Sequence, residues 1–404
     1  KGPVVDLKRA AKRIEELSKT YGLNVDPWAK IEDITVGMQQ RVEILKMLYR
    51  NAEILIFDEP TAVLTPQEIE DLMGIMRNLI AEGKSIILIT HKLKEIKAIA
   101  DRCTVIRRGK VIGTVDVADT DEARMAEMMV GRAVSFSVDK AQREPGEVVL
   151  DIENLHVLSG RKLPAINDLS LKVRNGEILG LAGVDGNGQT ELVEALTGLR
   201  KVQSGTIRLK GVDITHSSVR KRVRSGIAHI PEDRQRRGLV LDYTMEDNFI
   251  LEIYGLAPYS KHGFLNRKAI REHAGKLMDD FDVRAGEGPV APARALSGGN
   301  QQKAIVGREI DLNPDLLIAV QPTRGLDVGA IEYIHEQLLK ERDSGKAILL
   351  VSLELDEIMD LSDRILVMYE GRIVAELDPK RTTFHEIGLY MSGSKTEVKT
   401  DEAA

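Results

Sequence analysis

A chain of 404 residues, 43% hydrophobic and 30% charged, is long enough for two ordinary domains, each with its own core. Its longest apolar runs, such as SIILIT at 85–90, are far shorter than the roughly 18 to 20 residues that a membrane-crossing helix needs, so we expect no membrane span. A net charge of −6 argues against nucleic-acid binding, and the basic runs at 220–224 (RKRVR) and 234–237 (RQRR) are interpreted as solvated faces. Cys103 is the single cysteine, which excludes an internal disulfide and favours the reducing cytosol.

Short apolar strands alternate with polar-faced helices along the chain, the pattern of an α/β protein. In chain order, we expect strands at 53–57, 85–90 and 103–108, and again at 315–320, 347–352 and 365–370, with helices at 66–81 and 330–342. The turns RRGK and YEGR predict hairpins. Between the two sets, the period-two alternation at 147–157 and 168–183 predicts an antiparallel sheet that leads into a buried strand.

The two sets of strands belong to an internal repeat. ITVGMQQ at 34–40 matches LSGGNQQ at 296–302, and DEPT at 58–61 matches VQPT at 320–323, always 262 positions apart. A constant register predicts two homologous domains. The glycine-rich loop at 183–190 would have its counterpart before Lys1, so the first domain is expected to be incomplete and the chain N-terminally truncated. The expected limits are 1–134 for the first domain, 135–146 for a linker, 147–392 for the second domain and 393–404 for a flexible tail.

The loop GVDGNGQT at 183–190 follows a strand and precedes a helix, which is the context of a phosphate-binding loop. Glycines at Gly183, Gly186 and Gly188 let backbone amides turn toward an anion, and Thr190 supplies a hydroxyl. Gln189 stands where the consensus has lysine, so one positive charge on the phosphates is missing. The alternative is an ordinary strand-to-helix turn.

Acidic residues close the strand at 53–57. Asp58 suits a carboxylate that holds Mg²⁺ through water, and Glu59 suits one that orients or deprotonates the attacking water. His91 follows the next strand and could hydrogen-bond a terminal phosphate. A solvated turn for the two acids and an ordinary surface histidine are the alternatives.

The octet LSGGNQQK is the most specific motif of the chain. Ser297 and the amides of Gly298 and Gly299 open a helix predicted from Asn300 to Ile310, and together they predict an anion site. A plain helix cap is the alternative, but it accounts for Ser297 alone.

These motifs together resemble the ATP-binding subunit of an ABC transporter. LSGGN is similar to the family signature, ILIFDEP to the Walker B strand, GVDGNGQT to a degraded Walker A loop and the pair ending at Asp327 to the D-loop. The chain is most similar to the fused two-cassette ATPases of importers, in particular nucleoside importers with basic-membrane-protein receptors; sugar importers share several of these strings. The resemblance implies tandem P-loop ATPase domains, each with a RecA-like core and antiparallel β and helical subdomains.

Because cassettes of this family pair head to tail, the resemblance implies two composite ATP sites. One takes Asp58, Glu59 and His91 from the first copy and the signature with Asp327 from the second, all matching the working pattern. The other is degenerate, has Glu232 at the Q-loop position and faces the weakened signature ITVGM. Its substituted positions are Gln189, Val320, Gln321 and Leu353, where the pattern has Lys, Asp, Glu and His.

The resemblance implies an ATPase that uses ATP and Mg²⁺ and couples hydrolysis to import. Its expected partners are transmembrane permease subunits and, through them, a substrate-binding lipoprotein receptor, at the cytoplasmic face of the cell membrane. Without a first glycine loop, residues 1–404 alone are expected to be inactive. A sugar importer ATPase is the main alternative, followed by a soluble twin-cassette ATPase acting on ribosomes. A chromosome-associated ATPase would need long coiled coils, and a purely regulatory nucleotide-binding module would not need Glu59.

Overall fold

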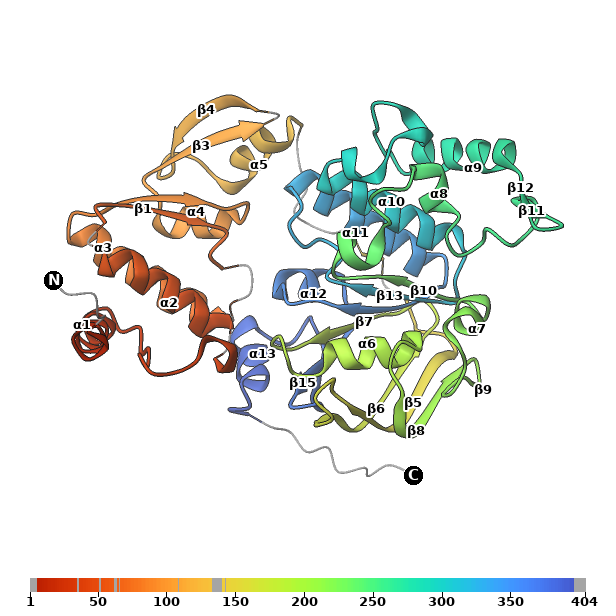
Figure 1. Ribbon diagram of the computed structural model, residues 1–404, viewed down its shortest axis with the longest axis horizontal. Coiled ribbons are helices and arrows are strands. Elements are labelled where there is room, and N and C mark those ends of the chain that lie inside the picture. Colours follow the sequence, from red (N-terminus) through yellow and green to blue (C-terminus); the bar gives the residue numbers. More distant parts are fainter. Residues whose placement is uncertain are drawn as a thin grey trace. The chain divides into compact units, whose positions relative to one another are not determined.

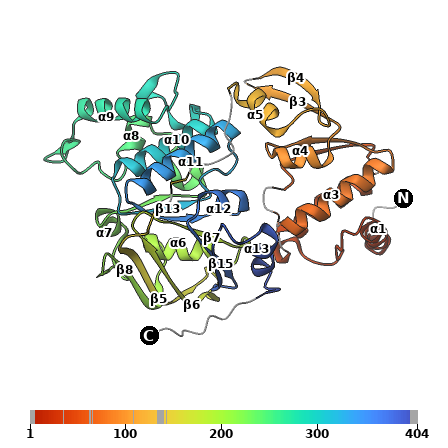
Figure 2. The same cartoon turned by 180° about the vertical axis from the view of Figure 1, so that it is seen from behind.

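The computed structural model describes residues 6–34, 36–50, 52–61, 64, 66–107, 109–132, 140–141 and 143–395 (Figures 1 and 2). The chain divides into two compact units, with the boundary between Val134 and Ser135. Each unit is described by itself below.

Unit 1 packs helices against one face of a small sheet. Its buried core joins residues of the second and third helices with strand residues Leu55 and Phe57. The elements are α1 (Leu7–Thr20), a 3₁₀ turn (Ile31–Asp33), α2 (Val36–Tyr49), β1 (Ile54–Asp58), α3 (Pro66–Ala81), β2 (Ser85–Ile89), α4 (Leu93–Ile99), β3 (Arg102–Arg107), β4 (Lys110–Asp116) and α5 (Glu122–Val130).

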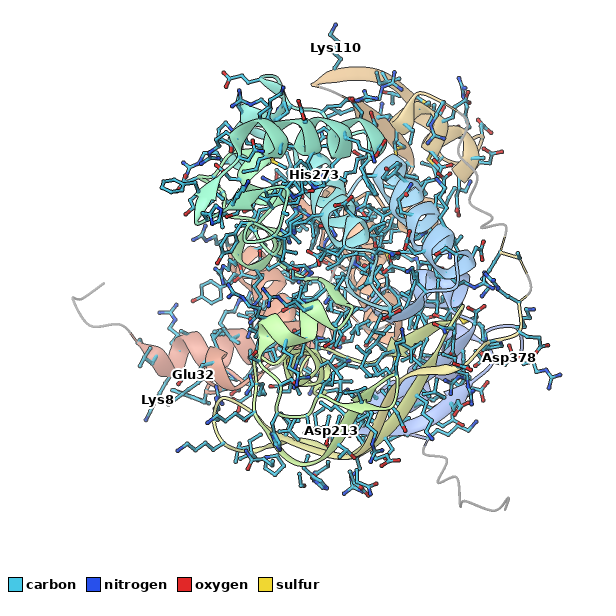
Figure 3. All side chains as sticks on the ribbon, turned by 90° about the vertical axis from the view of Figure 1, so that its right-hand side faces the viewer. Lys8, Glu32, Lys110, Asp213, His273 and Asp378 are labelled. Carbon is cyan, nitrogen blue, oxygen red and sulfur yellow. The ribbon has the colours of Figure 1, made fainter. Side chains whose placement is uncertain are left out.

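Strands β1 and β2 form a two-stranded parallel sheet among the residues described. Successive side chains of a strand point to opposite faces, and only one face of this pair is covered. Leu55 and Phe57 are buried, whereas Ile54 and Ile56 remain 63% and 58% exposed and Ile87 is 51% exposed. Strands β3 and β4 pair antiparallel, as the hairpin prediction requires, and Lys110 projects outward at one end of this ribbon (Figure 3).

Unit 2 is built on a six-stranded sheet in the order β10-β13-β14-β7-β15-β16, parallel except for β16. Alternate residues of the central strands face two separate cores. Leu317 and Ile348 pack with the helices, while Leu316 and Leu349 pack with α6 and the antiparallel sheet. The strands are β7 (Ile178–Ala182), β10 (Ile227–Ile230), β13 (Leu316–Val320), β14 (Ala347–Val351), β15 (Arg364–Tyr369) and β16 (Arg372–Leu377).

The antiparallel sheet of unit 2 has the order β6-β5-β8-β9. Its first two strands run into β7, which confirms the prediction of an antiparallel sheet followed by a buried strand. The strands are β5 (Val148–Leu158), β6 (Pro164–Arg174), β8 (Val202–Leu209) and β9 (Val212–Asp213), and a hairpin adds β11 (Ser260–Lys261) and β12 (Phe264–Leu265).

The helices of unit 2 include the two predicted from the sequence, at 300–310 and 330–342, each slightly longer than expected. They are α6 (Gln189–Thr197), α7 (Val219–Arg224), α8 (Met245–Phe249), α9 (Arg267–Asp280), α10 (Gly298–Asp311), α11 (Val328–Asp343), α12 (Leu355–Leu361) and α13 (Phe384–Met391), with a π-helical turn at Arg234–Gly238 and 3₁₀ turns at Gly288–Val290 and Ala293–Ala295.

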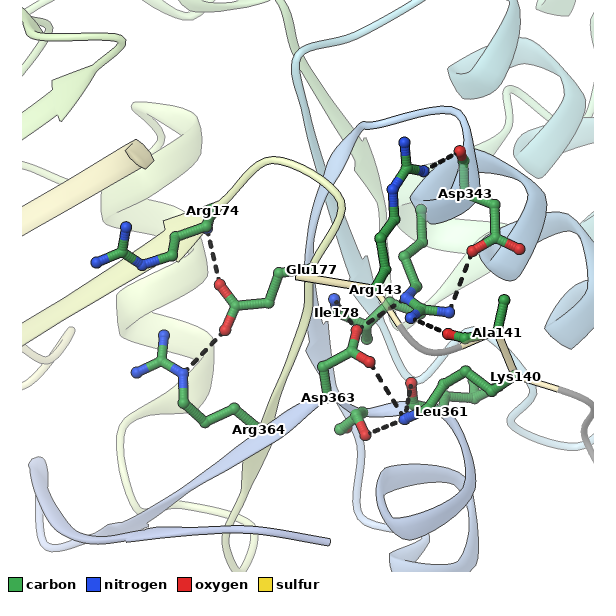
Figure 4. Close-up of polar contacts among 12 residues, drawn as sticks. Lys140, Ala141, Arg143, Arg174, Glu177, Ile178, Asp343, Leu361, Asp363 and Arg364 are labelled. Atoms are coloured by element: carbon green, nitrogen blue, oxygen red, sulfur yellow. Dashed lines mark hydrogen bonds and ion pairs between the residues drawn. The ribbon is translucent and has the colours of Figure 1, made fainter. Parts of the chain in front are cut away.

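The segment leading into unit 2 is tied to it by a buried charge network (Figure 4). Nζ of Lys140 donates to the carbonyl of Ser362 at 2.5 Å and lies 3.4 Å from the carboxylate of Asp363. Arg342, only 1% exposed, pairs with Asp363 at 2.9 Å and donates to the carbonyl of Ala141 at 2.7 Å. Asp363 also accepts the amide of Ile178 at 2.9 Å, which ties β7 to the same network. Burial lowers the pKa of Lys140, and Asp363 partly offsets this effect.

Removing Asp363 should destabilise unit 2 far more than removing Asp343, although both carboxylates contact Arg342. Asp363→Ala removes the more buried of the two counterions of a fully buried guanidinium, and breaking such a buried pair costs about 3 to 5 kcal/mol. Asp343 is 46% exposed, so Asp343→Ala should cost about 1 kcal/mol or less. Guanidinium chloride unfolding followed by circular dichroism measures the free energy of unfolding of both variants. An equal decrease in the two variants would contradict the prediction that the buried pair contributes more than the exposed one.

Candidate functional site

The end of β1 places two acidic residues in different settings. Asp58, the last residue of the strand, is exposed. Glu59 adopts a left-handed backbone conformation (φ 46°), and its amide donates to the carbonyl of Ile89 at 2.9 Å. Its side chain therefore lies beside the residue that follows β2, and Oε1 of Glu59 accepts a hydrogen bond from Nδ1 of His91 at 2.8 Å. The other oxygen, Oε2, is shielded from solvent and has no hydrogen-bond partner among the residues that the structure describes.

The corresponding turn of unit 2 has the same backbone but different side chains. Gln321, 262 positions after Glu59, is also left-handed (φ 45°), and its amide donates to the carbonyl of Val351 at 2.7 Å. Val320 is buried, and Leu353 stands at the position of His91. The second copy thus keeps the shape of the turn and lacks the carboxylate and imidazole pair.

A buried threonine and glutamate fix this turn in both units. The hydroxyl of Thr61 donates to Glu95, and Thr323 donates to Glu357 at 2.8 Å. All four side chains are at most 6% exposed. In unit 2, Nε2 of His335 lies 3.1 Å from the same oxygen of Glu357. The sequence analysis did not predict this threonine and this glutamate. Each is identical in the two copies at the constant spacing of 262, so the repeat alone could have indicated them.

The glycine loop lies between β7 and α6, as predicted. Gly186 and Gly188 are left-handed (φ 86° and 110°), and Gly188 is the N-cap of α6. A Cβ at Gly188 would meet the carbonyl oxygen of Ala165 at 2.6 Å, and one at Gly183 would meet Nε2 of Gln189 at 2.2 Å. Gln189 is 8% exposed, and its Nε2 has no hydrogen-bond partner in the described part of the chain. The tight backbone, the helix N-terminus with Thr190 in its first turn, and this unused donor fit a phosphate group.

The sheet of unit 2 brings several predicted positions to one edge. The glycine loop follows β7, Leu353 follows β14 and Val320 ends β13, and these three strands are parallel neighbours. The carboxyl ends of parallel strands form the ligand-binding edge of such a sheet. This edge therefore holds the residues of the predicted degenerate site. Glu232, partly buried, follows β10 at the same edge.

The octet LSGGNQQK opens α10. Ser297 is the N-cap, and its Oγ accepts a hydrogen bond from Nδ2 of Asn300 at 3.0 Å. Oδ1 of Asn300 accepts the amide of Arg284 at 2.9 Å. Asp327 caps α11 and accepts the amide of Ala330 at 2.9 Å. In the first copy, Thr35 lies outside the described residues, as do the side chains of Val36 and Gly37.

The basic runs are not both solvated faces, so that interpretation is wrong for two arginines. Arg222 is 2% exposed and donates to the carbonyls of Leu196 and Thr215 at 2.9 and 2.7 Å. Burial lowers the pKa of its guanidinium. Arg234 is partly buried and donates through Nη1 to the carbonyl of Arg324 at 2.8 Å. Basic composition alone did not separate these arginines from exposed neighbours such as Arg236.

Asp58 and Glu59 fit a Mg²⁺ ion that is held mainly by water and phosphate oxygens. Mg²⁺ prefers oxygen ligands and is commonly bound through one or two carboxylates plus substrate phosphates. Within the described ranges no group of three or more His, Cys, Asp or Glu side chains could hold a metal by itself. The exposed carboxylate of Asp58 and the unpartnered Oε2 of Glu59 are the oxygens available at this strand end.

Comparison with known proteins defines the class. The family model described as ABC transporter matches residues 5–62 and 166–324. The nucleoside import ATP-binding protein NupA of Lactococcus lactis subsp. cremoris is 59% identical over 97% of this chain and 78% of its own length. The guanosine import ATP-binding protein NupO of Bacillus subtilis is 58% identical (96% and 76%), and the glucose import ATP-binding protein TsgD13 of Haloferax volcanii is 48% identical (96% and 71%).

The chain therefore belongs to the ABC transporter family and is an ATPase of the ABC type. Solved structures agree on the fold: a nucleotide-free ATP-binding cassette from an ABC transporter has a TM-score of 0.50 at 24% identity, covering 57% of this chain and 92% of that one. An ATP-binding subunit of an ABC transporter has a TM-score of 0.50 at 22% identity, covering 60% and 99%. The predicted cassette fold is confirmed. The alignments do not bear out an N-terminal truncation, which stays a prediction.

The loop geometry predicts that two glycines differ in what they tolerate. Gly188→Ala should abolish the loop structure, because the added methyl carries the roughly 1 to 2 kcal/mol cost of a left-handed residue and also clashes with the Ala165 carbonyl. Gly186→Ala should carry the conformational cost alone, since nothing lies within 4 Å of its added Cβ. Thermal unfolding measures the decrease in melting temperature of each variant. A decrease in Gly186→Ala as large as that in Gly188→Ala would show that the predicted clash at Gly188 has no effect on stability.

Proposed function

We propose that the chain is the energy-coupling ATPase subunit of an importer that takes up nucleosides, with one competent composite ATP site and one degenerate site. The observation that carries the proposal is the contrast between the two strand ends. Glu59 and His91 form a 2.8 Å pair after β1, whereas the same backbone after β13 presents Gln321 and Leu353. The names and the 59% and 58% identities of the NupA and NupO relatives support the nucleoside substrate.

In the competent site, Glu59 is the residue that orients or deprotonates the attacking water. His91 holds Oε1 of this carboxylate at 2.8 Å, so Oε2, which has no protein partner, is the oxygen left for the water. Asp58 would hold Mg²⁺ through water. When bound, ATP supplies the phosphoryl group and Mg²⁺ offsets its negative charge. Ser297, the amides of Gly298 and Gly299, Asn300 and Asp327 complete the site from the second copy.

The degenerate site keeps donors that can bind nucleotide, but it lacks the groups needed for hydrolysis. The backbone of the glycine loop, Thr190 and the amide nitrogen of Gln189 still offer donors to phosphates. Val320 has no oxygen to hold Mg²⁺ and Leu353 cannot contact a phosphate, while the amide of Gln321 is not basic. This site therefore binds ATP as a clamp without hydrolysing it.

The partners we propose are transmembrane permease subunits and, through them, a substrate-binding lipoprotein receptor. In the part of the chain that the structure describes, no helix has both the length and the apolar character to cross a membrane. We place the ATPase at the cytoplasmic face of the cell membrane, where it couples ATP hydrolysis to transport through these permease subunits. An importer of sugars is the second candidate, because the glucose import relative is 48% identical.

In the full-length protein assembled with its permease, Glu59→Gln should nearly abolish turnover, because loss of a positioned base typically costs about 10² to 10⁴ in rate. Gln321→Glu should do little by itself, since Val320 and Gln189 remain. Ser297→Arg should be as damaging as Glu59→Gln, because Ser297 belongs to the competent site. Steady-state ATPase rates of the three variants measure these effects.

The matched control is Thr35→Arg, in the weakened signature that faces the degenerate site. It should lower nucleotide occupancy there and leave most of the turnover. If Thr35→Arg instead stops hydrolysis as completely as Ser297→Arg in an assembled complex, the division into one working and one degenerate site is wrong.

The substrate is tested separately from the chemistry. ATPase activity of the reconstituted complex should rise when the receptor is loaded with a nucleoside and should not rise with ribose or galactose. Stimulation by a free sugar alone would move the protein to the sugar importers and leave its ATPase assignment unchanged.

A further inference from the structure

Neighbouring segments of unit 2 hold its glycine loop in one conformation. The loop joins β7 to α6 (Figure 1). Oδ1 of Asn187 accepts the amide of Glu370 at 3.1 Å, and the carbonyl of Asn187 accepts the amide of Gly371 at 2.9 Å. Gly188 packs against the carbonyl of Ala165, which leaves no room for a Cβ. These contacts fix the directions of the loop amides independently of any ligand.

Gln189 adds a buried donor inside this loop. Its side chain is 8% exposed, and its Nε2 has no hydrogen-bond partner among the residues described. A Cβ built on Gly183, the first residue of the loop, would be 2.2 Å from Nε2, so the amide group of Gln189 lies inside the turn. The first amides of a helix have no partner within it, and those of Gln189 and Thr190 point out of the N-terminus of α6. A phosphate oxygen in the loop would satisfy these donors.

The loop offers its donors without a positive side chain. Residues 183–190 contain no lysine or arginine, and Asp185, which is exposed, adds a negative charge. The dipole of α6 contributes only about half an elementary charge. Gln189 stands at the lysine position, but its side chain is neutral and one bond shorter than that of a lysine. Each additional phosphate of a ligand therefore brings negative charge that the loop does not offset.

The positions that would meet a terminal phosphate carry uncharged side chains in unit 2. In a phosphate-binding loop, the backbone amides hold the α- and β-phosphates, and the lysine reaches the β- and γ-phosphates. Beyond the loop, Leu353 follows β14 and Gln321 follows β13, at the same edge of the sheet. Leu353 has no polar side-chain atom, and the side chain of Gln321 carries no charge. This edge is therefore equipped for two phosphates and not for the third.

We propose that the glycine loop of unit 2 recognises the diphosphate part of a nucleotide and does not distinguish ADP from ATP, with Gln189 as the residue that sets this specificity. The inference rests on the proposed function, because it takes this loop to be a nucleotide site. All the residues that carry it belong to unit 2. The site therefore keeps its nucleotide whether or not the terminal phosphate is present.

Equilibrium dialysis of residues 1–404 against radiolabelled ADP or ATP, with Mg²⁺ present, measures the two dissociation constants. The sequence has one such glycine loop, so we expect a single site, with Kd values for ADP and ATP that agree within about threefold. Gln189→Lys supplies a charge and a longer reach, so it should lower Kd for ATP roughly tenfold and Kd for ADP less than about threefold. Gln189→Met is the matched control: it has a similar size but no donor or charge, and it should weaken both nucleotides alike.

A wild-type Kd for ATP that is lower than that for ADP by roughly tenfold or more would overturn this inference and leave the proposed ATP clamp intact. An equal gain for ADP and ATP in Gln189→Lys would also overturn it. If Gln189→Lys does not fold, as judged by circular dichroism, the wild-type ratio decides.

Gly188→Ala tests the location of the nucleotide, because it disrupts the loop and should abolish binding of both ADP and ATP. Binding that survives in Gly188→Ala would place the nucleotide elsewhere. That result, or a wild-type protein that binds neither nucleotide, would reject the proposed nucleotide binding at the degenerate site together with this inference.

Discussion

The hydrogen bond from a buried threonine to a buried glutamate is the constraint on which both strand ends depend. It links the third residue after β1 or β13 to the helix that follows the neighbouring strand. A buried carboxylate needs hydrogen-bond donors, and the threonine hydroxyl supplies one of them in each unit, beside Thr90 at Glu95 and His335 at Glu357. With both ends tied, the intervening left-handed residue has one position available, and the side chain of Glu59 or Gln321 is placed accordingly. The geometry of the ligand-binding edge thus depends on the buried threonine and glutamate pairs, which have no part in the reaction.

This separation explains how one copy can lose its working groups and keep its fold. Gln321 and Leu353 occupy positions where the side chain faces the ligand edge, and replacing them removes no core contact. Thr323 and Glu357 lie in the interior, 6% and 3% exposed, where a change would leave a buried polar group unpaired. A copy can therefore lack the carboxylate and imidazole pair and still keep the backbone frame of this turn.

Much of this arrangement follows from the sequence, because repeats and periodic patterns report local structure. The helix at 66–81 and the strands of both copies lie within a residue or two of their predicted positions. The constant spacing of the repeat makes Gln321 the counterpart of Glu59, and both have the same left-handed backbone conformation. What could not be predicted depends on contacts between distant segments. Arg222 is held by the carbonyl of Leu196 in α6 and by the carbonyls of Thr215 and Ser217 just before its own helix, and a Cβ at Gly298, 64 residues after Arg234, would meet the Arg234 guanidinium. The charge composition of the sequence predicts neither the contacts of Arg222 nor those of Arg234.

The uncovered face of β1 and β2 has a consequence for handling the protein. Within the residues that the structure describes, these strands pair only with each other, and Ile54, Ile56 and Ile87 stand in a row on an open apolar face. Open strand edges next to exposed isoleucines are templates for intermolecular pairing, which natural sheets normally block with charges, proline or a covering element. Unit 1 expressed by itself should therefore self-associate through this face unless another segment or protein covers it.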